Sequence, residues 1–277
     1  MDTSVAKKAP LRGDYSRAAP DYTVEQDWSA YGSAEHALFR RLFERQSKLV
    51  PRYACPEWIN AIAGLDAGAI PKFDQVSRRL KAQTGWEIVA VPGLIPDEPF
   101  FTHLANRRFP VTVWLRKPEE FDYIVEPDVF HDFFGHVPLL FDRVYADHLY
   151  EYGKGGLKAM RLDAVTMLAR LYWYTIEFGL MRTPQGLRAY GAGLLSSGGE
   201  LAWCVDDPKP RRLAFDLERI LRTEYKIDSF QPIYFVIEGF DHLMRETAPD
   251  FTPLYARLRE LPPFAPEAPA PGDQVVG

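Results

Sequence analysis

Strand-forming patterns are scarce in this 277-residue chain, and that scarcity most limits the folds that it can adopt. Short runs rich in β-branched and aromatic residues occur at residues 87–91, 109–116 and 233–237. Apolar residues at helical spacing occur at residues 33–49, 56–65, 70–85, 157–180 and 211–225. Because the strands do not alternate regularly with helices, a doubly wound α/β fold is excluded. The sequence predicts a mainly α fold with a small β-sheet.

Composition and charge exclude several kinds of partner. Lys and Arg number 33 against 38 Asp and Glu, a net charge of −5, so no basic field attracts nucleic acid. An apolar run of about 18 residues is absent, which argues against a spanning helix and predicts no membrane partner. The 2 cysteines cannot form a disulfide framework, and the N-terminus has no apolar signal core. We therefore expect a cytoplasmic protein.

The two ends of the chain differ in composition from its middle. Residues 1–22 are polar, with Pro and Ala, and predict a flexible N-terminal arm. Residues 262–277 are rich in Pro and Ala, which sustain neither a helix nor a central strand, and predict a mobile tail. Since neither a repeat nor a linker interrupts residues 23–261, this part is predicted to form one compact domain.

The segment EPDVFHDFFGHVPLLF, residues 126–141, places two histidines among aromatic and aliphatic residues. His131 and His136 lie five residues apart, and on a regular α-helix their side chains would point about 140° apart. Gly135 suits the end of a helix, and Pro138 discourages its continuation. We therefore expect a short helix that ends near Gly135 and a His136 that turns back toward His131. Two imidazoles in that geometry can reach one metal ion; the alternative is a pair of hydrogen-bonded core histidines.

One acidic residue stands in the aromatic helical segment RLYWYTIEFGLM, residues 170–181. On a helix Glu177 lies within about 40° of Trp173, one turn earlier, so it shares a face with bulky rings. A carboxylate in those surroundings needs a cation, hydrogen bonds or a metal. The alternative to a metal ligand is pairing with Arg170 or Arg182, or exposure to solvent.

Two imidazoles and one carboxylate, without a nearby thiol, are the ligand set of mononuclear non-haem Fe(II). If they occupy one triangular face of an octahedron, three positions remain for water, O2 or substrate. The same side chains in tetrahedral geometry would suit a zinc hydrolase. A helical interaction module that binds no metal is a third possibility. The residues alone leave these alternatives open.

Three motifs in this order, EPDVFHDFFGHVPLL, YWYTIEFGL and YGAGLLSSGGEL, resemble those of the pterin-dependent aromatic amino acid hydroxylases. The likeness runs from about Trp86 to Glu238 and is strongest to single-domain bacterial members that act on phenylalanine. It implies a single catalytic domain of the aromatic amino acid hydroxylase type, with Fe(II) and a tetrahydropterin as cofactors. The implied reaction is monooxygenation of L-phenylalanine to L-tyrosine with O2, or the same chemistry on tyrosine or tryptophan. A monomer is expected, since the tetramerisation helix of animal members has no counterpart here.

The resemblance also implies roles for individual residues. The catalytic iron ligands fall on His131, His136 and Glu177. Substrate-binding positions fall on Arg116, Ile124, Trp173, Phe178 and Ser196. Pterin-binding positions fall on Ile95, Asp97, Phe100, Asp132, Ala169 and Tyr172. Among these, Arg116 is implied to bind the substrate carboxylate, for which a planar guanidinium is suited, and Phe100 is implied to stack on the pterin.

Four positions distinguish this chain from other members that it resembles. Asp132 stands where animal members carry glutamate, and Asp97 where they carry serine, so different pterin hydrogen bonds are expected. Tyrosine enzymes carry aspartate where this chain has Ile227, and tryptophan enzymes carry phenylalanine where it has Trp173. The last two positions together favour phenylalanine as the substrate.

Overall fold

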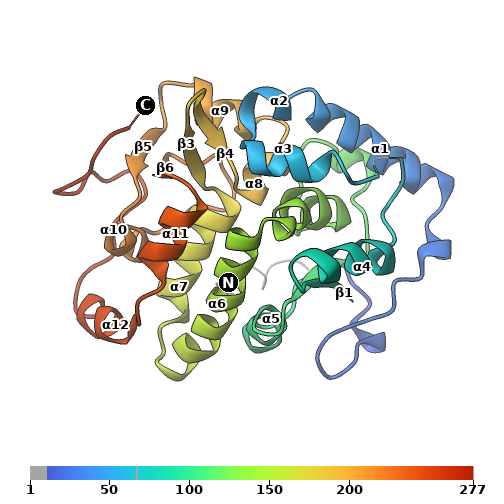
Figure 1. Ribbon diagram of the computed structural model, residues 1–277, viewed down its shortest axis with the longest axis horizontal. Helices are drawn as coiled ribbons and strands as arrows, with labels where there is room; N and C mark the ends of the chain where they lie inside the picture. The colour runs from blue at the N-terminus through green and yellow to red at the C-terminus, as the bar shows by residue number, and fades with distance from the viewer. Residues whose placement is uncertain (1–10, 67, 277) are drawn as a thin grey trace.

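The computed structural model of the chain describes residues 11–66 and 68–276. Two helices, α6 (Arg143–Arg161) and α7 (Val165–Tyr172), run through the middle of the molecule (Figure 1). The N-terminal helices lie on one side of this pair, and the larger β-sheet lies with the C-terminal helices on the other side (Figure 1). Helices dominate and the sheets are small, as the sequence predicts.

The remaining helices lie on the two sides of this pair. Those of the N-terminal side are α1 (Ser33–Ser47), α2 (Val50–Tyr53), α3 (Pro56–Ile62), α4 (Phe73–Gln83) and α5 (Asp97–Leu104). Those that follow α7 are α8 (Ala192–Ser196), α9 (Glu200–Asp206), α10 (Leu217–Arg222), α11 (Phe240–Thr247) and α12 (Thr252–Leu258). The three helices expected near the N-terminus are present as α1, α3 and α4, with Pro56 as the first residue of α3.

The strands of the described residues form two sheets. β1 (Glu87–Val91) and β2 (Arg108–Thr112) pair in parallel. The larger sheet has the order β4-β3-β6-β5, from β3 (Leu180–Thr183), β4 (Gly186–Ala189), β5 (Arg211–Ala214) and β6 (Ile233–Ile237). β6 is buried along its length and pairs in parallel with β3 and β5, whereas β3 and β4 form an antiparallel hairpin. β1 and β6 have the bounds expected from sequence, and β2 is shorter than the expected 109–116.

The expected helix over residues 211–225 is wrong. Its first part is strand β5, which pairs with β6, and only α10 is helical. Residues 211–214 form a strand because they pair with β6, a buried strand that is remote in sequence. The apolar spacing within the segment cannot reveal that pairing.

The expected single helix over residues 157–180 is also wrong. α6 begins at Arg143 and ends at Arg161, and Asp163 then adopts a left-handed conformation with φ 50°. The Ala164 N–H donates to Ala159 O at 2.9 Å, which closes a Schellman motif without the glycine that normally announces one. The chain restarts as α7 and reaches β3 at Leu180.

Both chain ends contact the rest of the molecule. In the tail, the Val276 N–H donates to Arg212 O at 2.8 Å, and Asp273 forms a buried ion pair with Arg219 at 2.9 Å. In the arm, the Tyr15 hydroxyl donates to Leu94 O at 2.9 Å. Residues 1–10 and 277 lie outside the described residues, and the boundaries 1–22, 23–261 and 262–277 stay a prediction.

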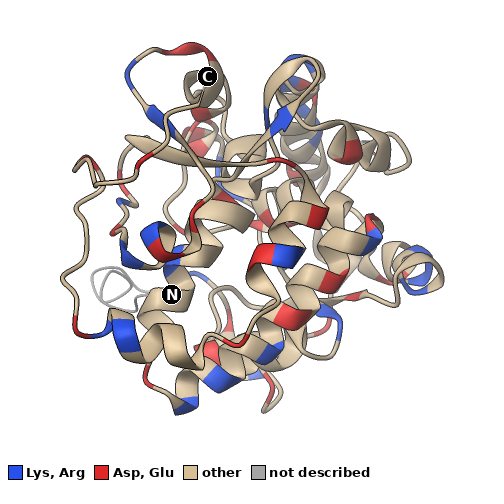
Figure 2. Cartoon of the chain, turned by 60° about the vertical axis from the view of Figure 1, so that its left-hand side comes forward, with Lys and Arg blue, Asp and Glu red and all other residues tan. Residues whose placement is uncertain are grey.

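The charged residues are interspersed in sign. Figure 2 shows acidic and basic residues mixed along the chain rather than gathered in separate regions of the molecule. Within the part of the chain that the structure describes, no helix is both long enough and apolar enough to cross a lipid bilayer.

Candidate active site

Both candidate ligand segments are π-helical turns. The first spans His131–His136 and the second, at the end of α7, spans Trp173–Glu177. Hydrogen bonds in a π-helix join residues five apart, so the spacing that separates two side chains on an α-helix brings them to one side here. The expected helix end at Gly135 is therefore wrong, because the chain stays helical through His136 and continues as a 3₁₀ turn over Val137–Phe141.

Gly135 allows close packing and does not end the helix. A Cβ atom at this position would lie 2.8 Å from both the Cβ and the carbonyl oxygen of Ala192 in α8. That distance is well inside van der Waals contact, so a side chain would force α8 away from the His131–His136 turn. The glycine thus lets α8 pack directly against the histidine segment.

The aromatic residues around the two histidines anchor the first π turn. Phe130, Phe133 and Phe134 are completely buried. The Phe134 ring packs against Phe130 at 4.9 Å, stacked, and against Phe43 of α1 at 5.0 Å, edge to face. These contacts fill the core on one face of the turn, while the two imidazoles project from it toward Glu177. The apolar setting noted in the sequence therefore holds the polar pair in place.

His131, His136 and Glu177 converge. One donor atom from each lies within 4.8 Å of the others, with His136 Nε2 3.1 Å from Glu177 Oε1 and His131 Nε2 3.6 Å from Glu177 Oε2. Two donors that bind one ion at about 2.1 Å and at right angles lie about 3.0 Å apart, so the spacing fits a shared metal. Among the described residues, no other group of three His, Cys, Asp or Glu side chains meets this criterion. Glu177 pairs with neither Arg170 nor Arg182. Arg170 donates to Leu221 O, and Arg182 forms an ion pair with Glu238.

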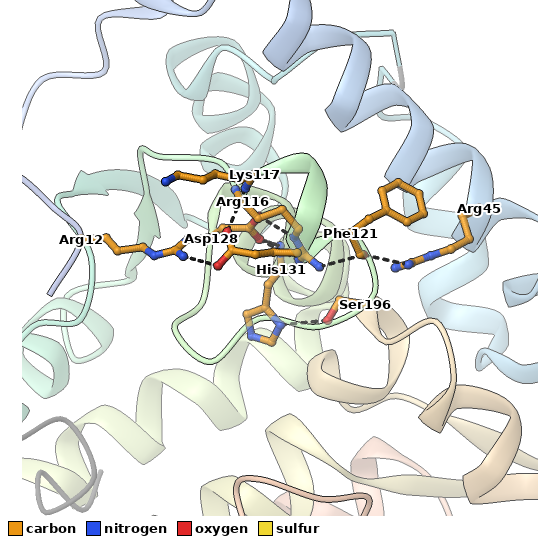
Figure 3. Close-up of polar contacts among 9 residues, drawn as sticks. Arg12, Arg45, Arg116, Lys117, Phe121, Asp128, His131 and Ser196 are labelled. Atoms are coloured by element: carbon orange, nitrogen blue, oxygen red, sulfur yellow. Dashed lines mark hydrogen bonds and ion pairs between the residues drawn. The ribbon is translucent and has the colours of Figure 1, made fainter. Parts of the chain in front are cut away.

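Ser196 fixes the tautomer of His131. The Ser196 hydroxyl donates its proton to Ala192 O at 2.9 Å, so its oxygen accepts from His131 Nδ1–H at 2.8 Å (Figure 3). Nε2 of His131 is then unprotonated and offers a lone pair toward Glu177. A hydrogen bond to the remote ring nitrogen is the usual device that orients a histidine ligand.

Burial and neighbouring groups shift the pKa of His131 and the pKa of Glu177. Burial lowers the pKa of His131, which favours the neutral imidazole that a metal requires. Burial raises the pKa of Glu177, but His136, His131 and a hydrogen bond from Tyr172 together outweigh it, so the pKa lies below its ordinary value. A neutral histidine beside an ionised glutamate is the form that binds a divalent cation.

Asp128 links Arg116 to the histidine turn. Its fully buried carboxylate accepts from Arg116 Nε at 2.8 Å and Nη2 at 2.9 Å, and also from the main-chain N–H of Arg116 and of His131, each at 2.9 Å (Figure 3). The expected carboxylate-binding Arg116 thus lies beside the triad, held by one edge of its guanidinium. Sequence reasoning missed Asp128, although an acid three residues before a helical histidine is a known N-terminal capping pattern that would have found it.

Trp173 and Phe178, two of the other expected substrate residues, lie in contact. Its ring stacks on Tyr225 at 4.3 Å and lies 4.6 Å from Phe178, and its Nε1–H donates to Gln231 Oε1 at 3.0 Å. Ile124 is half-buried in the loop between Arg116 and Asp128. Gln231 is a further contact of Trp173 that the sequence did not indicate.

Part of the expected pterin set is brought together. Phe100 of α5 lies 5.8 Å from the Tyr172 ring, and Tyr172 lies 6.3 Å from the His136 ring. Asp132 accepts from the Thr112 N–H at 2.8 Å, and burial raises its pKa. The remaining members lie on the same two helices or beside them: Ile95 just before α5, Asp97 at its start and Ala169 in α7.

A mainly α domain with a buried His, His, Glu triad defines a mononuclear metal enzyme in which three protein ligands leave coordination positions open. The family model described as biopterin-dependent aromatic amino acid hydroxylase matches residues 11–256, and the chain belongs to this family. Membership confirms the predicted fold class, the enzyme class and the pterin cofactor.

Relatives and solved structures agree with this assignment. The chain is 53% identical over 259 residues to a phenylalanine-4-hydroxylase of Ralstonia nicotianae, covering 93% of this chain and 83% of the relative. It is 54% identical over 263 residues to the Chromobacterium violaceum phenylalanine-4-hydroxylase, covering 94% and 89%. An iron- and phenylalanine-bound structure of phenylalanine hydroxylase from C. violaceum superposes with a TM-score of 0.90 at 51% identity, covering 100% of both chains.

Proposed function

We propose that this chain is a phenylalanine 4-monooxygenase, which converts L-phenylalanine to L-tyrosine with O2, Fe(II) and a tetrahydropterin. The observation that carries the proposal is the convergence of His131, His136 and Glu177 within 4.8 Å, in a chain of the biopterin-dependent family. The names of its relatives and the iron- and phenylalanine-bound neighbour support both the substrate and the metal.

In this proposal the metal is held by His131 Nε2, His136 Nε2 and one or both oxygens of Glu177. A bound iron would supply the site at which O2 is activated, and a reduced pterin would supply the two electrons that the reaction needs. The protein's part is to keep water from the reacting atoms, and the low exposure of His136 (3%) and Glu177 (8%) serves that purpose.

Arg116 orients the substrate through its carboxylate. Two of its nitrogens are engaged by Asp128, and Nη1 faces Phe121 O at 3.5 Å, so the remaining N–H groups are available in a fixed plane. Trp173, with Phe178 packed against it, lines the pocket for the aromatic ring, and Ser196 keeps His131 aligned. Ring and carboxylate held at two ends place one ring carbon against the metal, which is catalysis by positioning.

Phenylalanine is favoured over tyrosine by the segment that contacts Trp173. Tyr225 and Gln231 both touch the indole, and Ile227 lies between them with its carbonyl bound by the Tyr123 hydroxyl at 3.3 Å. An apolar residue at this position, where tyrosine enzymes carry an aspartate, offers no hydrogen-bond partner to the phenolic hydroxyl of tyrosine.

For the pterin, Phe100 is the proposed stacking ring, with Tyr172 beside it and Ile95, Asp97, Asp132 and Ala169 around it. A monomer in the cytoplasm is also part of the proposal. The two free, buried cysteines support the cytoplasmic location, because thiols stay reduced there.

An oxygen-electrode assay with metal analysis on one preparation tests the function. We expect one Fe per chain and O2 uptake that requires both pterin and phenylalanine, with stoichiometric tyrosine. A zinc hydrolase would contain Zn and consume no O2, and an interaction module would contain no stoichiometric metal. Parallel assays with tyrosine and tryptophan measure the substrate preference.

A further inference from the structure

Gln46 is a buried amide far from the metal residues in sequence, and its side chain is fully enclosed at 0% exposure. It lies at the end of α1, with each of its polar groups satisfied. Nε2 donates to Leu195 O at 2.6 Å and to Ser197 O at 3.0 Å, while Oε1 accepts from Arg45 Nε at 3.0 Å. This pattern fixes the orientation of the amide, because the reversed amide would set its oxygen against two carbonyls and its nitrogen against a guanidinium.

The two carbonyls that Gln46 binds flank Ser196. They lie at the C-terminal end of α8, where the last carbonyls of a helix have no partner within it. Ser196 is the residue whose hydroxyl accepts from His131 Nδ1 at 2.8 Å. The backbone on both sides of that hydroxyl is therefore held by one side chain from α1.

α8 is packed against both ligand segments, so its position affects all three metal-binding side chains. On one side Ala192 contacts Gly135 in the His131–His136 turn, where no Cβ fits. On the other side Gly191 approaches the second turn so closely that a Cβ would lie 2.4 Å from Glu177 O. A shift of α8 would thus disturb the His131 hydrogen bond and the packing around Glu177 together.

Arg45 extends the same connection to Arg116. Its Nη1 donates to Phe121 O at 2.9 Å, and Arg116 Nη1 faces the same oxygen at 3.5 Å. Figure 3 shows Phe121 between the two arginines, with Ser196 below them on α8. The adjacent residues Arg45 and Gln46 therefore contact the Arg116 loop and α8 respectively.

We propose that Gln46 is a positioning residue for the metal site, which holds Ser196 and hence His131 in the geometry that binds the metal. The inference rests on the proposed function only in that the triad binds a divalent metal. A side chain that merely joined α1 to α8 would affect stability and leave metal affinity unchanged.

The test is Co(II) titration of metal-free protein, followed by the d–d absorption of the bound ion, with thermal unfolding of the same metal-free samples. Gln46→Leu keeps the volume and removes all three hydrogen bonds. We expect its Co(II) dissociation constant to rise about tenfold, as for loss of a residue that supports a metal ligand, and its Tm to fall by about 5 °C.

Gln26→Leu is the matched control. Gln26 also binds main-chain groups with both ends of its amide, donating to Pro71 O and accepting from the Phe73 N–H, each at 2.9 Å, and neither of these partners belongs to the site. It should lower the Tm and leave Co(II) binding unchanged. Equal Co(II) affinity in the parent and in Gln46→Leu would overturn the proposal.

Gln46→Glu covers the case in which Gln46→Leu fails to fold. It preserves the shape and the bond from Arg45 but replaces the two donated N–H groups with a carboxylate oxygen. We expect the same rise in the Co(II) dissociation constant, and an unchanged value would overturn the proposal. A parent that binds no Co(II) would refute the proposed function itself, which separates the two failures.

Discussion

His148 of α6 is a buried histidine whose protonation is opposed by its hydrogen bonds. The Thr247 hydroxyl donates its proton to Leu243 O at 2.7 Å, so its oxygen accepts from His148 Nδ1–H at 3.0 Å. Among the described residues, no acceptor lies within hydrogen-bonding reach of His148 Nε2. A second proton would place an unpaired charge inside the protein, and burial lowers the pKa of His148 to about 4.

The effect on stability follows from the gap between this pKa of about 4 and the ordinary value of 6.5. As pH falls below 6.5 the unfolded chain binds a proton that the folded chain refuses until about pH 4, so the free energy of unfolding decreases through this window. The loss reaches about 3 kcal/mol at and below pH 4, and the loss between about pH 7.5 and 5.5 is about 1 kcal/mol.

Urea unfolding of metal-free protein at about pH 5.5 and 7.5 measures this loss in the parent and in His148→Gln. Glutamine does not titrate, so the variant should lose about 1 kcal/mol less on acidification, whatever constant offset the substitution causes. Other titrating groups, such as His103, whose pKa burial also lowers, contribute to both proteins and cancel in the comparison. The same pH dependence in the two proteins would refute the claim that His148 is held neutral by burial.

Three further predictions concern the site. Glu177→Ala removes one of the three converging side chains and should reduce iron content and phenylalanine-dependent O2 uptake to background; an iron-loaded, active variant would exclude Glu177 as a ligand. Arg116→Lys keeps a positive charge beside Asp128 but loses the planar fork, so steady-state kinetics should show the KM for phenylalanine rising about tenfold or more, with kcat less affected; an unchanged KM would remove Arg116 from the pocket. Asp128→Ala leaves the buried Arg116 guanidinium without its partner and should cost about 3–5 kcal/mol in urea unfolding; a cost below about 1 kcal/mol would show that water compensates Arg116.

Residue type made the candidate metal ligands predictable from sequence. An aromatic setting is costly for His131, His136 and Glu177 unless something satisfies them, and that argument needs no knowledge of the fold. Helices α1, α3 and α4 and strands β1 and β6 were predictable for a similar reason, since burial of one face produces a periodic pattern of apolar residues in the sequence. Strand β5 was not predictable, because only one of its four side chains, that of Leu213, is buried, and so the strand shows no periodic pattern of burial.

Asp128 and Gln46 differ in how far along the chain they lie from the residues that they bind. Asp128 lies three residues before His131, within reach of a local capping argument. Gln46 lies 149 residues from Leu195 and 151 from Ser197, and nothing in the local sequence of α1 distinguishes a buried amide that binds α8 from one that faces solvent. Only the packing of α1 against α8 gives that side chain its partners.

The convergence of His131 and His136 was expected from a helix break, but a π-helical turn produces it. Side chains five residues apart cannot align on an α-helix, and a helix break at Gly135 was one way to bring them together. The chain instead widens the turn, which weakens its backbone hydrogen bonding and persists only where other contacts hold it. Those contacts are the Phe134 ring against Phe43 of α1 and Ala192 of α8 against Gly135. Each of these partners is remote in sequence. The candidate ligands can therefore be identified from their local sequence, whereas their geometry depends on tertiary contacts.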